Sequence, residues 1–164
     1  MHSWTLSVVT AVVTAMMLFA SASSVVAADA LTSFAEFDRR AKAGEHLTVV
    51  FYGASLTWGA NATDPNNTSY RGVMADYFRE RYPDARFRFY DSAIGGTGSN
   101  LGVFRFDRDV VGRKPDIVFL DFSANDDIYS ATPESLASYE AIVRRLVGEL
   151  EVPTVIAMFP FRWN

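Results

Sequence analysis

The sequence contains no cysteine and only two histidines, His2 and His46, among its 164 residues. The lack of cysteine excludes disulfide bonds, cysteine-based zinc sites and a thiol nucleophile. Any hydrolytic chemistry would therefore have to come from hydroxyl, carboxylate or imidazole groups. No motif implies a metal or an organic cofactor.

Basic residues form no cluster, and the formal net charge is -4 at pH 7. Nucleic acids and anionic membrane surfaces are usually bound through patches of lysine and arginine. The charge pattern therefore predicts no nucleic-acid partner and favours a small-molecule or glycan substrate. With 49% hydrophobic and 21% charged residues, the composition is that of a globular domain, and it leaves the oligomeric state open.

Long apolar runs are also missing. The run from Leu6 to Ala20 is shorter than the roughly 18 residues of a membrane span, and serine and threonine interrupt it. Small residues follow up to Ala30, and no lysine, arginine or glutamate precedes that position, which is typical of a secretory signal. We therefore expect a signal peptide over residues 1–28, one domain over residues 29–164, secretion to the extracellular space or periplasm, and no stable membrane anchor.

The remaining sequence predicts strands that alternate with helices. Runs rich in β-branched and aromatic residues predict strands over residues 47–52, 86–90, 116–122 and 152–159. Apolar periodicity and capping residues predict helices over residues 32–44, 70–82, 101–112 and 132–147, with N-caps at Thr32 and Thr132. The residues expected to be buried are Phe34, Phe37 and Ala41 in the first helix; Tyr70, Val73, Met74, Tyr77 and Phe78 in the second; and Leu136, Tyr139, Val143, Leu146 and Val147 in the fourth. The alternation predicts an α/β fold, a three-layer α/β/α sandwich with a parallel sheet.

The first of three motifs follows the first predicted strand. Gly53 lets the chain turn sharply, so that Ser55 projects its hydroxyl at the sheet edge. Ligands of parallel sheets bind beyond the carboxyl ends of the strands, which makes Ser55 a candidate nucleophile. The alternative is a tight turn of small residues without a chemical role.

A glycine-rich loop over residues 91–100 follows the second predicted strand. The backbone N–H groups of such a loop can point at an oxyanion or at a phosphate. A dinucleotide site fits less well, because Leu101 stands where G-x-G-x-x-G requires glycine. The loop also follows the second strand rather than the first, where dinucleotide-binding folds place theirs.

Asn125 follows the third predicted strand and can direct its side-chain amide toward the same crevice. Alone, its segment would be interpreted as a polar turn. Three successive strand ends that carry serine, glycine and asparagine together predict one catalytic crevice.

These blocks resemble, in order and position, those of the SGNH hydrolases, also called GDSL-like lipases and acylhydrolases. The resemblance covers about residues 47–160. It implies an SGNH (flavodoxin-like) fold and the hydrolysis of carboxylic esters by acyl transfer to water. Ser55 corresponds to the family nucleophile, and the Gly96 N–H, the Asn125 side chain and the Ser55 N–H correspond to its oxyanion donors.

Three positions depart from the family pattern. Ala54 stands where the first block usually has aspartate, Asp91 where the second often has asparagine, and Ser123 where the third often has glycine. None of these changes removes a reacting atom. The G-x-S-x-G elbow of α/β-hydrolases fits less well, because Thr57 occupies its last position.

The family's last block, an aspartate and a histidine three residues apart, has no counterpart, because no histidine follows Asn125. His46 precedes the first strand and Ser55 follows it, so they lie roughly 20 Å apart, whereas a base must come within about 3 Å of the hydroxyl. His2 lies in the expected signal peptide. We therefore expect an inactive chain whose fold is truncated after its fourth strand, leaving an apolar edge prone to self-association.

Two functions remain open. One is a secreted serine esterase for carboxylic esters, among them acetyl esters of carbohydrates. The other is a non-catalytic carbohydrate- or ligand-binding module, in which Tyr52, Trp58 and Tyr70 stack on sugars. The loop after the first motif is expected to be exposed because it holds N-glycosylation sequons at Asn61, Asn66 and Asn67.

Overall fold

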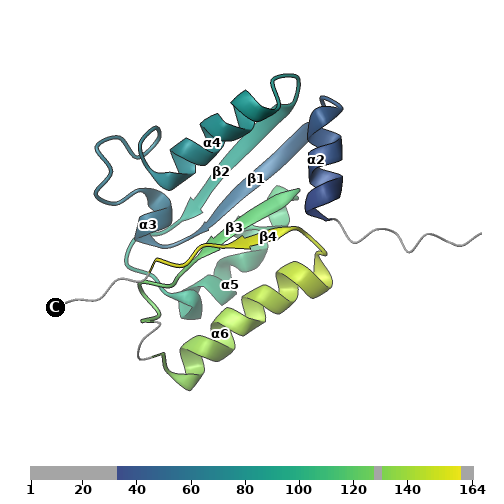
Figure 1. The fold of residues 1–164 in the computed structure, drawn as a ribbon. Helices are drawn as coiled ribbons and strands as arrows, with labels where there is room; N and C mark the ends of the chain where they lie inside the picture. Colours follow the sequence, from purple (N-terminus) through teal and green to yellow (C-terminus); the bar gives the residue numbers. More distant parts are fainter. Residues whose placement is uncertain (1–32, 128–130, 160–164) are drawn as a thin grey trace, which may run out of the picture. The chain divides into compact units, whose positions relative to one another are not determined.

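A computed structural model describes residues 33–127 and 131–159, so the expected signal peptide lies outside the described residues. Its parallel strands form one sheet in the order β2-β1-β3-β4 (Figure 1). The strands are β1 (His46–Gly53), β2 (Arg86–Ala93), β3 (Ile117–Asp121) and β4 (Thr154–Ile156). Each of the four predicted strands is thus present.

Helices cover both faces of the sheet. One face carries α2 (Phe34–Lys42) and α4 (Tyr70–Arg81), and the other carries α5 (Ser99–Asp109) and α6 (Pro133–Arg144) (Figure 1). A short helix, α3 (Ser55–Trp58), follows β1, a 3-10 turn spans Val111–Arg113, and a π-helical turn spans Arg145–Glu149. The predicted three-layer α/β/α sandwich is confirmed. Within the described ranges, no helix combines the length and the apolarity that crossing a membrane requires.

The central strand β1 fills both layers of the core. Val49 and Phe51 pack on the side of α2 and α4, while Val50 and Tyr52 pack on the side of α5 and α6, and all four are fully buried. Burial on both faces explains why β1 is a nearly continuous apolar run rather than an alternating one.

The structure corrects several details of the helices. Ser33 rather than Thr32 caps α2, because its Oγ accepts the Glu36 N–H at 3.1 Å; Thr32 lies outside the described residues. Five side chains expected to be buried are exposed: Phe34, Val73, Tyr77, Leu136 and Val147. In α4, Gly72 and Ala75 form the buried face together with Phe78, since a side chain on Gly72 would collide with the backbone at Asn66. Apolar residues on several sides of these helices made the buried face ambiguous.

The ends of two strands also differ from prediction. β2 continues to Ala93, whereas β4 is confined to Thr154–Ile156 at one edge of the sheet. Pro153, which has no N–H to donate to a neighbouring strand, precedes β4.

Candidate active site

The carboxyl ends of three strands lie level with one another. Gly53 of β1 pairs with Ala93 of β2 on one side and with Asp121 of β3 on the other. The serine, glycine and asparagine motifs follow these ends within a few residues. The three motifs therefore start from level strand ends at one edge of the sheet.

Ser55 is the first residue of α3 and is half-buried. A Cβ atom on Gly53 would lie 2.2 Å from both the Asp121 carbonyl oxygen and the Thr57 Oγ1. Close packing therefore requires glycine at position 53. Backbone conformation is not the reason, because the φ of Gly53 is not in the left-handed region. Within the described ranges, no side chain hydrogen-bonds to the Ser55 hydroxyl.

The glycine-rich loop lies directly beside the serine. A Cβ atom on Gly95 would be 3.8 Å from the Cβ of Ser55. Gly96 has a left-handed backbone, with φ of +73°, and no atom lies within 4 Å of its Cβ position. In the described part of the chain, the N–H groups of Ser55 and Gly96 donate no hydrogen bond to another residue. Neither donor is therefore committed to an acceptor among the described residues.

Asn125 is exposed in the turn that ends β3. The N–H groups of Asn125 and Asp126 donate to the Phe122 carbonyl at 3.1 and 3.0 Å. Asp126 Oδ1 accepts the Ser99 N–H at 2.8 Å and so ties this turn to the start of α5. Gly96 and Asn125 line one cavity of about 610 Å³. Ser55 does not line that cavity and meets its glycine loop through Gly95 instead.

A network of buried hydrogen bonds joins α3 to the end of β3 and to Tyr70 of α4. It was not predicted from the sequence. The Tyr70 hydroxyl donates to Thr57 Oγ1 at 3.0 Å, and Thr57 donates to Asp121 Oδ2 at 3.3 Å. The Ser123 N–H and hydroxyl donate to Asp121 Oδ1 at 3.0 and 2.7 Å. Burial raises the pKa of Asp121 above its ordinary value, although these hydrogen bonds oppose the shift.

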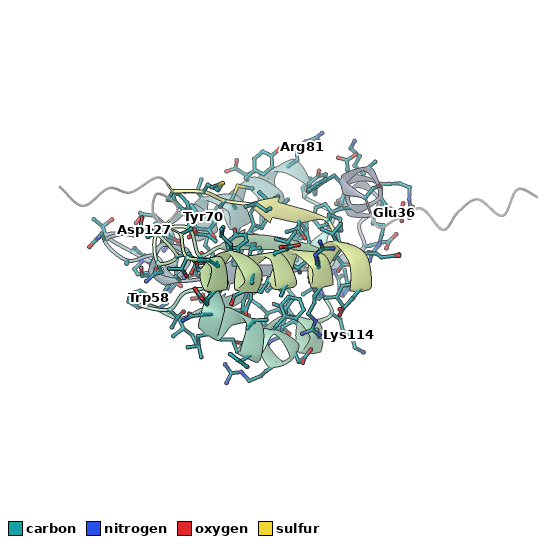
Figure 2. All side chains as sticks on the ribbon, turned by 90° about the horizontal axis from the view of Figure 1, so that it is seen from below. Glu36, Trp58, Tyr70, Arg81, Lys114 and Asp127 are labelled. Atoms are coloured by element: carbon teal, nitrogen blue, oxygen red, sulfur yellow. The ribbon has the colours of Figure 1, made fainter. Side chains whose placement is uncertain are left out.

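Only one of the three aromatic residues expected to stack on sugars is exposed. Tyr52 is fully buried, which contradicts that expectation. Tyr70 packs edge-on against Phe51 and is also mostly buried, whereas Trp58 is 49% exposed. The sequon residues Asn61, Asn66 and Asn67 are exposed, as predicted. Trp58, Tyr70 and Asp127 lie at the end of the molecule away from Glu36 and Lys114 (Figure 2).

His46 begins β1 and pairs with Arg86, at the opposite end of the strand from Gly53. It therefore does not reach Ser55, as expected. Among the described residues, no group of three or more His, Cys, Asp or Glu side chains is arranged to hold a metal ion.

Two solved esterase structures are similar to this chain. A two-domain esterase active on acetylated mannans, crystallised with mannopentaose, is 31% identical with a TM-score of 0.70; the match covers 76% of this chain and 33% of that one. An acetylxylan esterase from Geobacillus stearothermophilus, solved as a catalytic mutant, is 19% identical with a TM-score of 0.55 over 67% of this chain and 58% of its own, and it shares the fold.

The chain therefore spans about a third of the mannan esterase's length. No curated protein sequence matches it. The sequence model of the GDSL-like lipase/acylhydrolase family matches residues 51–164, and this chain belongs to that family.

Proposed function

We propose that this chain carries the nucleophile and the oxyanion donors of a secreted serine esterase that cleaves acetyl esters of carbohydrates. The observation that carries the proposal is that Ser55 lies beside the Gly95-Gly96 loop, and that Gly96 lines one cavity with Asn125, at one edge of the sheet. The apolar, small-residue segment before Ala30 supports secretion.

In the proposed reaction, the Ser55 oxygen attacks the ester carbonyl carbon and its proton passes to a general base. The carbonyl oxygen becomes an oxyanion that accepts hydrogen bonds from the Ser55 and Gly96 N–H groups and the Asn125 amide. Collapse of this intermediate breaks the ester C–O bond and releases the alcohol with that proton. Water then attacks the acyl-enzyme, frees the carboxylic acid and restores the serine.

The general base is not among the described residues, where His46 is the one histidine and lies at the far end of β1. We infer that residues outside this chain supply it. Residues 29–164 on their own would then bind an ester without cleaving it.

The cavity shared by Gly96 and Asn125 suits a polar alcohol group. Hydroxyl, amide and carboxylate side chains line it, namely Thr97, Asn100, Asn125, Asp126, Thr132, Glu134 and Ser135. Sugars present hydroxyl groups that pair with such side chains. The 31% identity to an esterase active on acetylated mannans supports a glycan acetyl ester as substrate.

The test compares the secreted product of the complete gene with its Ser55→Ala variant on p-nitrophenyl acetate and on acetylated mannan. Hydrolysis that is lost in Ser55→Ala supports the esterase. Equal activity in both proteins would refute Ser55 as the nucleophile. Absence of hydrolysis together with saturable mannan binding would favour the carbohydrate-binding module.

A further inference from the structure

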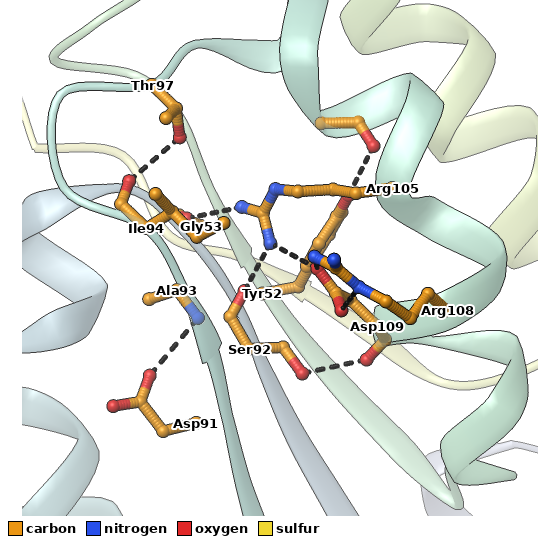
Figure 3. Close-up of polar contacts among 11 residues, drawn as sticks. Tyr52, Gly53, Asp91, Ser92, Ala93, Ile94, Thr97, Arg105, Arg108 and Asp109 are labelled. Carbon is orange, nitrogen blue, oxygen red and sulfur yellow. Dashed lines mark hydrogen bonds and ion pairs between the residues drawn. The ribbon is translucent and has the colours of Figure 1, made fainter.

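Arg105 is a buried cation next to the candidate site. It belongs to α5, is 7% exposed, and lies against the ends of β1 and β2 (Figure 3). Arginine is rarely buried to this extent unless its charge and its donors find partners. The proposed reaction steps make no use of this side chain.

The guanidinium group joins the two strand ends that lead into the site. Its Nη2 donates to the Gly53 carbonyl at 2.8 Å, and its Nη1 donates to the Ser92 carbonyl at 2.7 Å (Figure 3). The Gly53 carbonyl also accepts the Ile94 N–H at 3.1 Å. Ser55 follows Gly53 closely, and Gly95 follows Ser92 and Ile94. One planar group therefore connects the serine turn with the glycine loop.

Neighbouring groups hold the Arg105 guanidinium group in this orientation. Asp109 Oδ2 accepts from Arg105 Nη1 at 2.8 Å, and Asp109 Oδ1 accepts from Arg108 at 2.6 Å. Burial raises the pKa of Asp109, but hydrogen bonds from Arg108 and Arg105 outweigh it, and the pKa falls below its ordinary value. The guanidinium carbon also lies 4.5 Å from the centre of the Tyr52 ring.

We propose that Arg105 is a positioning residue for the ester hydrolysis proposed above, on which this inference rests. By bridging the Gly53 and Ser92 carbonyls, it sets the separation between Ser55 and the Gly96 N–H. Oxyanion donors stabilise the transition state only at close range, so a small displacement of the loop weakens catalysis more than substrate binding.

The geometry distinguishes this role from a merely stabilising ion pair. Pairing with Asp109 alone would require one donor, which lysine also provides. The two strand carbonyls, in contrast, accept from two separate nitrogens of one rigid plane, Nη1 and Nη2, whereas lysine has a single nitrogen. The shape of the group, as well as its charge, is therefore expected to matter.

The test uses the complete secreted gene product with Arg105→Met, Arg105→Lys and a matched control, Arg40→Met. Arg40 donates to Glu45 at 2.8 Å and to Asp116 at 2.5 Å, near the amino ends of β1 and β3. Its loss is expected to lower the melting temperature and leave kcat unchanged. Arg105→Met is expected to lower kcat for p-nitrophenyl acetate by about 100-fold, with little change in KM, and Arg105→Lys to restore only part of it.

Chemical rescue of kcat in an alanine variant is the second measurement. In Arg105→Ala, added guanidinium ion is expected to raise kcat, because it can occupy the vacated space and bridge the same carbonyls, whereas added ammonium is not. Unchanged kcat in folded Arg105→Met would overturn the proposal, as would equal losses of kcat in Arg105→Met and Arg40→Met. If Arg105→Met does not fold, Arg105→Lys decides, and full activity there overturns the proposal. Ser55→Ala, measured in parallel, reports separately on the proposed function: activity that survives in it refutes that function.

Discussion

The hydroxyl of Thr57 lies 3.3 Å from Oδ2 of Asp121, and this hydrogen bond joins the helix that begins at Ser55 to the carboxyl end of β3. Both side chains are buried, at 0% and 1% exposure. Because Tyr70 donates to the same Thr57 oxygen, the hydroxyl both accepts and donates. Each member of a buried network depends on its partners, because an unpaired polar group is costly in the low-dielectric interior.

Thr57→Val is expected to destabilise the fold, because it keeps the shape of the side chain and removes its polar atom. Asp121 Oδ2 and the Tyr70 hydroxyl would then lose a partner, at a cost of about 1–3 kcal/mol. Urea unfolding of the complete gene product measures this loss. The control is Tyr70→Phe, which leaves the Thr57–Asp121 bond intact and is expected to cost less. Equal losses of unfolding free energy in the two variants would contradict the inference that Thr57 links Tyr70 to Asp121.

Asp121 also predicts a pH dependence of stability. Burial raises its pKa above the ordinary 3.8, so the folded chain binds the proton more tightly than the unfolded chain. Its favourable contribution is therefore full below pH 3.8 and declines as the pH rises through the folded pKa. Asp121→Asn removes this dependence. The free energy of unfolding of the variant, relative to that of the parent, is expected to increase as the pH rises above 3.8; a constant difference would contradict the shift.

The strands were predictable because β1 and β3 are short apolar runs that only a doubly covered sheet accommodates. The placement of Ser55, Gly96 and Asn125 followed from the rule that ligands bind beyond the carboxyl ends of parallel strands. The supporting contacts did not follow, because they join distant residues: Arg105 lies 52 positions from Gly53, and Thr57 lies 64 positions from Asp121. Nothing local marks an arginine in a helix as buried, or an aspartate at a strand end as the partner of a particular threonine.

Gly53→Ala is expected to prevent stable folding or to displace Ser55. The added methyl group would lie 2.2 Å from the Asp121 carbonyl oxygen, which is fixed backbone. Gly148→Ala is the matched control, because no atom lies within 4 Å of its Cβ position. That variant is expected to gain about 0.5–1 kcal/mol, since alanine loses less backbone entropy on folding. Thermal melts and circular dichroism measure both, and a Gly53→Ala variant as stable as the parent would contradict the close packing.

Asn125→Ala tests the oxyanion role without disturbing the core, because the side chain is exposed. Loss of one preorganised donor is expected to lower kcat by about 100- to 1,000-fold with little change in melting temperature. Asp76→Ala, at an exposed position on α4 that does not line the cavity, is the control and is expected to leave kcat nearly unchanged. The measurement is p-nitrophenyl acetate hydrolysis by the complete gene product. A loss of tenfold or less would argue that Asn125 is not an oxyanion donor.

The edge of the sheet at β4 predicts self-association of residues 29–164 expressed on their own. Ile156 is 46% exposed and Met158 58% exposed, and they border an apolar cavity of about 650 Å³ together with Leu136 of α6. An edge strand with exposed apolar side chains is a template for pairing with a second chain.

Lysine on an edge strand opposes such pairing, because a second strand would have to bury its charge. Ile156→Lys is therefore expected to shift the chain toward monomer in size-exclusion chromatography with light scattering. Val73→Lys replaces a similarly exposed apolar residue on α4, away from this edge, and is expected to leave the distribution unchanged. A parent chain that is already a monodisperse monomer would contradict the prediction. If both lysine variants shift the chain toward monomer equally, the effect comes from net charge rather than from the β4 edge.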